Sequence, residues 1–300
     1  MTEGTREVAL HAAGHDFRIR VYPAGRPGGA ALVWLHGGAF MFGTSDMPEA
    51  DEVGRRLAAV GVPVVSVDYT LAPLDALPEY PEDPPEGMPT PEQIRAELAA
   101  AGPRARFPVA SLQTVAAFDW TVQHAHELGA DPARIALGGA SAGGNLAAGA
   151  TVRLRDRATV VPSALLLAYP VLHRVLPDAD DELLGLLAGL PRMLTFPPDD
   201  VRDFNRNYVG DEALLDDPAA FPGGHDLRGL PPTVLVTADR DRLRSSAQAF
   251  AAELAVAGVD VVLQRERAAL HGFLNEVGHP AATRAIRRFA SELDPTRSTS

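Results

Sequence analysis

The sequence predicts an α/β protein in which a mostly parallel central sheet is flanked by helices on both faces. Short apolar runs bounded by turn residues alternate with helical patterns along most of the chain. These runs are apolar at nearly every position, as expected of strands buried on both faces. The chain has 300 residues, 46% of them hydrophobic, which is enough to bury a large core. We therefore expect residues 1–300 to form a single domain.

The strands are expected at the apolar runs. Near the N-terminus, Glu7–Leu10 and Asp16–Tyr22 are predicted to form an antiparallel pair at the sheet edge, because apolar and polar residues alternate there. The later runs predict buried strands at Ala31–Leu35, Pro63–Val67, Arg134–Leu137, Ala164–Tyr169 and Thr233–Thr237. A late strand is also predicted at Val259–Arg265. Helical patterns occupy residues 48–60, 107–128, 143–157, 243–257 and 280–292.

One segment that interrupts this alternation is residues 74–106, which contain seven prolines and seven acidic residues. A short helical stretch is expected around Pro91–Ala101. The segment follows a predicted strand, and the ligand crevice of an open parallel sheet lies beyond the carboxyl ends of its strands. We therefore interpret it as a lid over the mouth of an active site. The alternative is a solvated, proline-rich loop without function.

A second interruption, residues 176–208, is rich in leucine and follows another predicted strand. We expect it to form a helical cap that supplies an apolar pocket. The alternative is an ordinary crossover helix that is buried because it packs on the sheet.

The composition excludes several classes of protein. The net charge of −12 makes nucleic acid and anionic membranes poor partners. The absence of cysteine excludes disulfides and thiolate catalysis. No apolar run is long enough for a signal peptide or a membrane helix, so we expect a cytoplasmic protein without membrane insertion.

A Gly-Ala-Ser-Ala-Gly sequence at residues 139–143 lies between a predicted strand and a predicted helix. Small residues on both sides allow the central serine to occupy a strained backbone conformation at a tight strand-to-helix corner. That corner would expose the hydroxyl of Ser141 beside the first amides of the helix, where negative charge is favoured. The pattern predicts that Ser141 is a nucleophile. The alternative is a small-residue turn that only lets helix and strand approach closely.

The sequence His-Gly-Gly-Ala-Phe at residues 36–40 follows the first buried strand. Two glycines there let the backbone approach a substrate oxygen and present N–H groups to it. We assign the oxyanion donors to Gly37 and Gly38, together with Ala142, the residue after the nucleophile. His36 is expected to hydrogen-bond the backbone and hold this loop, because no second metal ligand stands at a suitable spacing.

The base and the acid are expected late in the chain, because this class of site has the order nucleophile, acid, base. His271 follows the last predicted strand and is assigned as the base. Asp239 and Asp241 both follow the strand at 233–237 and could orient the histidine. Position favours Asp241, which leads into a helix.

These motifs resemble those of the bacterial hormone-sensitive-lipase-like esterases, also called family IV lipolytic enzymes, which have the α/β-hydrolase fold. The similarity extends over roughly residues 18–289. Besides the His-Gly-Gly and Gly-x-Ser-x-Gly motifs, it includes Asp68–Pro73 (D-Y-R-L-A-P in the family), Phe107–Ala110 (F-P-A-A), Asp241–Arg244 (D-P-L-R) and His271–Phe273 (H-G-F). The register of these motifs selects Asp241 over Asp239 as the acid.

Several positions depart from the family pattern. Ala140 stands where the family usually has an aspartate that braces the oxyanion loop, so this support is missing or is supplied elsewhere. Thr70 replaces the usual arginine. The N-terminal cap helices of the family are not expected, because the first predicted strand begins within ten residues of Met1. We hypothesise that residues 74–106 take over part of the lid role.

The expected function is a serine carboxylesterase that hydrolyses short-to-medium acyl or small-alcohol esters through an acyl-enzyme, without metal or cofactor. The expected partner is a small-molecule ester, and the protein is expected to be a monomer or homodimer. Pocket residues are expected to be Phe40, Leu183, Leu187, Met193, Phe196 and Phe273.

Two other functions remain open at this stage. The same triad could act on a lactone, carbamate, amide or natural-product O-acetyl group. The chain could also be a non-catalytic ligand-binding protein of this fold, like the plant gibberellin receptor. Such proteins typically lose the base, whereas His271 is present here.

Overall fold

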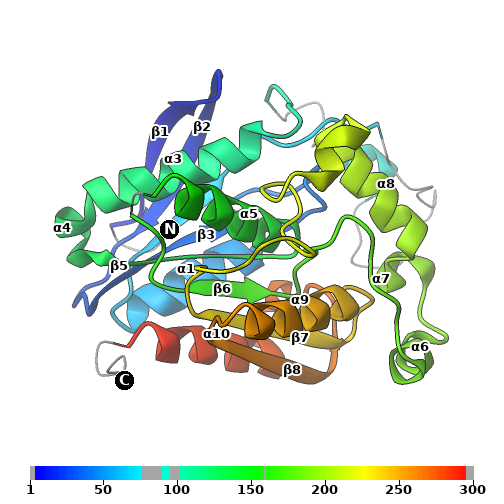
Figure 1. The fold of residues 1–300 in the computed structure, drawn as a ribbon. Helices are drawn as coiled ribbons and strands as arrows, with labels where there is room; N and C mark the ends of the chain where they lie inside the picture. Colours follow the sequence, from blue (N-terminus) through cyan, green and yellow to red (C-terminus); the bar gives the residue numbers. More distant parts are fainter. Residues whose placement is uncertain (1–3, 76–89, 95–101, 159, 295–300) are drawn as a thin grey trace.

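A single eight-stranded sheet organises the computed structural model, which describes residues 4–75, 90–94, 102–158 and 160–294 (Figure 1). Its strands are β1 (Arg6–Ala12), β2 (His15–Tyr22), β3 (Gly29–Leu35), β4 (Val64–Asp68), β5 (Ala130–Ala140), β6 (Leu165–Ala168), β7 (Thr233–Arg240) and β8 (Val261–Leu270). Their order is β1-β2-β4-β3-β5-β6-β7-β8. The pairs β1–β2 and β2–β4 are antiparallel, and every later pair is parallel. The predicted strands and the edge pair are confirmed.

The register of the central strands brings three strand ends together. Leu35 at the end of β3 pairs with Gly139 of β5, and Ala140 pairs with Ala168 of β6. The residues that follow these three strands therefore emerge side by side at the carboxyl edge of the sheet. His36, Ser141 and Tyr169 are those residues.

Helices cover both faces of the sheet, as expected. On one face α3 (Val109–Gln123), α5 (Ala142–Asp156) and α9 (Arg244–Val256) enclose a core that includes Phe118 and Phe250. The predicted helix over 107–128 is divided, because the chain turns at His124 before the short helix α4 (Ala125–Leu128).

The opposite face carries α1 (Pro48–Ala59) and α10 (Pro280–Glu292), which pack around Trp34 and Phe289. Helix α1 buries Ala50, Val53 and Leu57, a spacing that places all three on one side of the helix. Each large apolar side chain buried in this way contributes about 1.5–3 kcal/mol. A hydrophobic core on each face of the sheet therefore fixes the strands whose ends carry the site.

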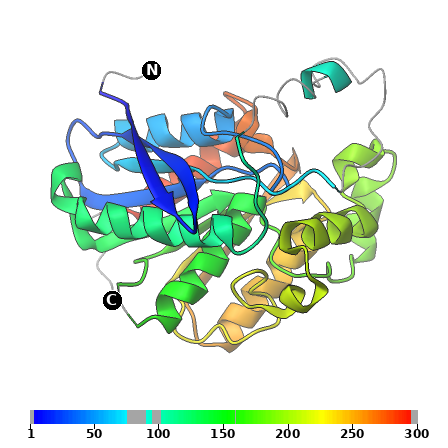
Figure 2. The same cartoon turned by 90° about the horizontal axis from the view of Figure 1, so that it is seen from above.

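Three helices after β6 form a separate group: α6 (Asp181–Leu187), α7 (Arg192–Thr195) and α8 (Pro198–Val209). They lie together at one end of the molecule, on the right in Figure 1 and also in Figure 2. Asp180 caps α6 by accepting a hydrogen bond from Leu183 N at 2.7 Å. Residues 176–208 are thus largely helical, as several short helices.

Both ends of the 74–106 segment contact the last turn of α8. Asn207 donates to Pro73 O at 2.6 Å, and Arg106 donates to Asn207 Oδ1 at 3.1 Å. Phe107 N donates to Tyr208 O at 2.9 Å. Residues 91–94 are helical, as expected, and lie at the same end of the molecule as α6–α8 in both views. Residues 76–89 and 95–101, which make up most of the expected lid, fall outside the described residues.

In the part of the chain that the structure describes, none of the helices has the length and apolar character needed to cross a membrane.

Candidate active site

Ser141 occupies the corner between β5 and α5, with φ 53° and ψ −119°. A positive φ costs a non-glycine residue roughly 1–3 kcal/mol and persists only where the surroundings enforce it. Here Ser141 N donates to Ala168 O at 2.8 Å, and the helix begins at the next residue. A Cβ on Gly143 would lie 2.3 Å from His36 O, so the corner requires glycine there. The hydroxyl is thereby held at the carboxyl edge of the sheet.

His271 links Ser141 to Asp241. Its Nε2 lies 3.0 Å from Ser141 Oγ, and its Nδ1 lies 2.8 Å from Asp241 Oδ2. Asp241 is fully buried, and its other oxygen accepts a hydrogen bond from Leu243 N at 2.9 Å. The carboxylate assigns the ring tautomer: Nδ1–H donates to Asp241, which leaves Nε2 free to accept the serine proton. This arrangement can deprotonate the hydroxyl and stabilise the resulting imidazolium.

Asp239, the other acid that position left open, binds elsewhere. It accepts hydrogen bonds from Ala268 N at 3.0 Å and from Arg265 Nε at 2.5 Å, and Arg244 lies 3.3 Å away. Burial raises the pKa of Asp239, but the Ala268 N–H and the two guanidinium groups outweigh it, so the pKa is lowered. Arg265 also pairs with Glu182 of α6 at 2.7 Å. Asp239 therefore belongs to an ion-pair network that joins α6 to the sheet.

Two aromatic rings pack against His271. The ring of Phe196 lies 4.5 Å from the imidazole and that of Tyr169 lies 4.8 Å from it, measured between centroids. Both residues have positive φ, 46° and 37°. Burial and the nearby Glu49 carboxylate hold the pKa of Tyr169 well above its usual value, so its hydroxyl stays protonated. Sequence reasoning missed Tyr169, although its place directly after the strand next to β5 could have indicated it.

The loop after β3 lies against Ser141. Of its two amides that were expected to bind an oxyanion, the amide of Gly37 already has a partner. Gly37 N donates to Glu49 Oε1 at 2.5 Å and therefore cannot hold an oxyanion. The assignment of Gly37 as a donor is wrong for this reason. The amides of Gly38 and Ala39 have no hydrogen-bond acceptor among the described residues. Ala142 N opens α5, where no intrahelical acceptor exists for it.

The backbone of this loop turns sharply at Gly38. Gly38 has φ 113°, and its carbonyl accepts hydrogen bonds from Met41 N at 2.9 Å and Phe42 N at 2.8 Å. Ala39 follows at φ 51°. A Cβ on Gly37 would lie 3.0 Å from the Cβ of Ser141, which shows how closely the loop approaches the serine. The loop therefore approaches the serine at Gly37, directly before the two residues whose amides are free.

His36 holds the loop from inside, as expected. It is fully buried, and its Nδ1–H donates to Gly37 O at 2.7 Å. Its ring stacks on Tyr69 at 4.3 Å, and the Tyr69 hydroxyl donates to His36 O at 3.0 Å. Burial lowers the pKa of His36 and keeps the imidazole neutral. Among the described residues, no group of three or more acidic or histidine side chains is placed to hold a metal ion.

Comparison with known proteins agrees with this geometry. The sequence profile of the alpha/beta hydrolase fold family matches residues 32–86 and 99–275, more than half of the chain. The chain belongs to the α/β-hydrolase fold family. It is 31% identical over 292 residues to carboxylesterase NlhH of Mycobacterium tuberculosis, covering 93% of this chain and 78% of the relative. Hormone-sensitive lipase of Mus musculus is 30% identical over 178 residues, which are 59% of this chain and 19% of that lipase.

A solved structure supports the same assignment. EstE1, a thermostable carboxylesterase cloned from a metagenomic library, has a TM-score of 0.78 and 30% identity, covering 99% of this chain and 90% of that protein. The expected resemblance to bacterial hormone-sensitive-lipase-like esterases and the expected α/β-hydrolase fold are confirmed.

Several residues expected to line the substrate pocket of this α/β hydrolase are interior. Phe40 is 2% exposed and stacks on Tyr208 at 4.0 Å, and Leu183 and Phe273 are equally buried. None of the three is among the residues that line the cavity described next, so their place in a substrate pocket stays a prediction. The side chain of Met193 lies outside the described residues.

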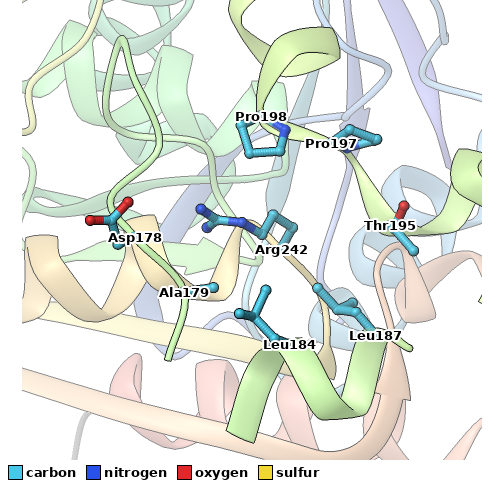
Figure 3. A pocket seen from close by; sticks show the side chains of 8 residues that line it. All are labelled: Asp178, Ala179, Leu184, Leu187, Thr195, Pro197, Pro198 and Arg242. Carbon is cyan, nitrogen blue, oxygen red and sulfur yellow. The ribbon is translucent and has the colours of Figure 1, made fainter. Parts of the chain in front are cut away.

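An open cavity of about 560 Å³ lies beside the helical group (Figure 3). Its lining consists of Asp178, Ala179, Leu184, Leu187, Thr195, Pro197, Pro198 and Arg242. Two of the lining residues, Thr195 and Pro197, are the sequence neighbours of Phe196, whose ring contacts His271. Leu187 was expected here. Arg242 was missed, because the family pattern has proline at its position and only the fold brings it to the helical group.

Proposed function

We propose that this α/β hydrolase is a serine carboxylesterase that cleaves short-to-medium acyl or small-alcohol esters of small molecules through an acyl-enzyme on Ser141. The relatives are carboxylesterases and related esterases, and the chain is a carboxylic ester hydrolase. The observation that carries the detailed proposal is the continuous chain of contacts from Ser141 through His271 to the buried carboxylate of Asp241.

The first half-reaction forms the acyl-enzyme. His271 Nε2 takes the proton of Ser141 as Oγ attacks the ester carbonyl, and Asp241 stabilises the imidazolium. The negative charge develops on the carbonyl oxygen, toward which the free amides of Gly38, Ala39 and Ala142 are directed in our proposal. Each such donor lowers the barrier by about 3–4 kcal/mol. His271 then protonates the departing alkoxide, and the C–O bond of the ester breaks.

The second half-reaction releases the acid. Water takes the place of the alcohol, His271 removes its proton, and the hydroxide attacks the acyl carbonyl. The tetrahedral intermediate again places its charge among the same three amides. Collapse of this intermediate returns the proton to Ser141. His271 thus acts alternately as base and acid, for which its contact with Ser141 Oγ at 3.0 Å is suited.

The cavity beside the helices α6–α8 supports the proposed substrate size. Leu184, Leu187 and the two prolines offer an apolar surface, while Arg242 and Asp178 make one wall polar. We propose that α6–α8 act as a cap over this space, and that residues 74–106 act as a lid anchored on α8 through Asn207. A cavity of this volume accommodates a small ester rather than a long-chain lipid.

The direct test replaces the nucleophile. Ser141→Ala should reduce the hydrolysis of p-nitrophenyl butyrate by roughly 10⁴-fold or more, because no hydroxyl remains to form the acyl-enzyme. Circular dichroism should show an unchanged fold. The exposed Ser291→Ala is the matched control and should retain wild-type kcat/KM. Activity that survives in folded Ser141→Ala would refute the proposed mechanism.

A further inference from the structure

Glu49 is a buried acidic side chain that lies close to the site, and the mechanism above assigns it no role. It stands in the first turn of α1, a place where acidic residues are common on protein surfaces because they complement the helix dipole. The structure instead leaves Glu49 only 2% exposed. A buried carboxylate is retained only where several donors satisfy it.

The donors to Glu49 come from the three loops that build the site. Gly37 N of the oxyanion loop donates to Oε1 at 2.5 Å. The Tyr169 hydroxyl, from the end of β6, donates to Oε2 at 2.8 Å. Asn275, in the short helix η2 (Phe273–Asn275) that follows His271, donates to Oε2 at 3.1 Å. One carboxylate therefore connects the oxyanion loop to Tyr169, whose ring packs against His271, and to Asn275, which follows His271 in the chain.

The backbone of Glu49 is fixed as firmly as its side chain. Its N–H donates to Asn275 Oδ1 at 3.2 Å, and its carbonyl accepts the indole N–H of Trp34 at 3.0 Å. Trp34 is fully buried between the sheet and α10. The carboxylate thus rests on a rigid core element and not on a mobile surface turn.

Ala140 explains why such support is needed. Hormone-sensitive-lipase-like esterases usually carry aspartate at this position to brace the oxyanion loop, and alanine cannot do so. Ala140 is fully buried, and its carbonyl would lie only 3.2 Å from a Cβ on Gly37, so position 140 and Glu49 approach the same glycine. Helix α1 therefore places a carboxylate where the nucleophile motif lacks one.

We propose that Glu49 is a positioning residue of the oxyanion hole: by holding the Gly37 amide, it orients the next two amides, Gly38 and Ala39, toward the oxygen bound at Ser141. This inference rests on the proposed function. Glu49 touches neither the substrate nor Ser141 in this scheme. Its effect is confined to the placement of donors, which matters most when the negative charge is fully developed.

The substitution Glu49→Gln is the most informative because it keeps the side-chain volume. A glutamine has one acceptor oxygen and one NH₂ group, so it cannot accept from Gly37, Tyr169 and Asn275 together. One donor must turn away or meet another donor. We expect kcat for p-nitrophenyl butyrate to fall about 10–100-fold with KM changed less than threefold, somewhat less than the loss of one complete oxyanion donor.

Inhibition by a trifluoromethyl ketone distinguishes a positioning role of Glu49 from a purely structural one, which would leave the Ki unchanged. The ketone adds to the serine hydroxyl and places an oxyanion in the same hole, so its Ki should rise by the same factor as kcat/KM falls. Glu52→Gln, on the same helix, is the matched control and should leave kcat and Ki within twofold of wild type. Unchanged Ki and kcat in folded Glu49→Gln would overturn the inference.

A rescue variant keeps the inference testable if Glu49→Gln folds poorly. In a Glu49→Ala background, Ala140→Asp restores the family's own brace and should recover kcat at least tenfold. No recovery of kcat or Ki in this folded double variant would contradict the inference. Failure of the proposed function has a different signature, because wild-type protein itself would then neither hydrolyse the ester nor bind the ketone.

Discussion

One ring nitrogen of His271 contacts the hydroxyl of Ser141, and the other contacts a buried carboxylate. This second contact shows which of two neighbouring aspartates is paired with the histidine. Asp241 lies 2.8 Å from the ring, whereas Asp239 is engaged by Ala268, Arg265 and Arg244. The two aspartates are only two positions apart and both are shielded from solvent. Their roles can therefore be tested by the same substitution at each position.

Asp241→Asn should lower kcat by about 10⁴-fold, because asparagine no longer fixes the productive tautomer of His271. Asp239→Asn should leave kcat within threefold of wild type. It should instead reduce the free energy of unfolding by roughly 1–3 kcal/mol, because two arginines lose their carboxylate. Steady-state kinetics and urea unfolding of both variants test this. The reverse pattern, inactive Asp239→Asn and active Asp241→Asn, would contradict the assignment of the acid.

The stability effect of Asp239 should depend on pH. Its pKa in the folded protein is lowered from the ordinary value of 3.8, so the folded state favours the charged form. The stabilisation is present above the unfolded pKa and is lost as the pH falls through the folded pKa. The difference in unfolding free energy between wild type and Asp239→Asn should be largest near pH 7 and should decrease as the pH falls below the ordinary pKa of 3.8. A difference independent of pH would exclude the carboxylate charge as its cause.

The oxyanion loop shows what sequence can and cannot predict about single residues. The glycine pair located the loop, because only glycine fits where a Cβ on Gly37 would meet Ser141 and Glu49. It did not identify which amides are free. That depends on Glu49, twelve positions later in another element, whose carboxylate occupies the Gly37 N–H. The acid, base and nucleophile were easier to predict because each directly follows a strand.

Among the elements, the central strands β3 to β7 were predictable because each contains a short apolar run that is buried on both faces. The edge pair β1 and β2 was predictable from its alternation of apolar and polar residues. The order of the strands was not, since the sheet places β4 between β2 and β3. The break between α3 and α4 at His124 has no proline or glycine to mark it. The helices α6–α8 were expected only as a helical segment, because their ends depend on local caps such as Asp180 and Gly210.

Asn207 connects two elements that interrupt the alternation of strands and helices. Its amide binds Pro73, and its side-chain oxygen accepts from Arg106, so both ends of the 74–106 segment rest on α8. Arg104, inside the same segment, donates to Met41 O at 2.8 Å and Ala72 O at 2.7 Å. The segment is thereby connected to the loop that carries the free amides. This arrangement supports the proposed lid and identifies the residues that a test must preserve.

Replacing residues 76–101 by a short Gly-Ser linker should change the selectivity for acyl length while keeping Arg104 and Arg106 in place. We expect kcat/KM to fall about tenfold more for p-nitrophenyl octanoate than for the acetate, because the longer acyl chain loses apolar contacts worth about 0.8 kcal/mol per buried CH₂. As a control, the same Gly-Ser linker inserted in the exposed turn between β1 and β2, at Ala13–Gly14, should leave the selectivity for acyl length unchanged. Equal changes for all acyl lengths would exclude the lid role.

At the scale of the whole molecule, the candidate active site lies where the sheet, the hydrophobic core and the helices α6–α8 adjoin. The sheet aligns the ends of β3, β5 and β6, the core beneath it fixes Glu49 and Trp34, and α6–α8 border the adjoining cavity. The alignment of these strand ends was predicted from the sequence, because the catalytic motifs follow predicted strands. The support of Glu49 by the core and the border of the cavity could not be predicted, because both depend on contacts between segments far apart in the chain.

The central claim is that Ser141 is the activated nucleophile, and covalent labelling tests it most directly. Wild-type protein should react with a fluorophosphonate at one site per chain, and peptide mass spectrometry should locate the adduct on Ser141. His271→Ala should slow this labelling by at least 10²-fold, because the serine loses its base. A stable protein that is not labelled, or that is labelled at another residue, would contradict the account.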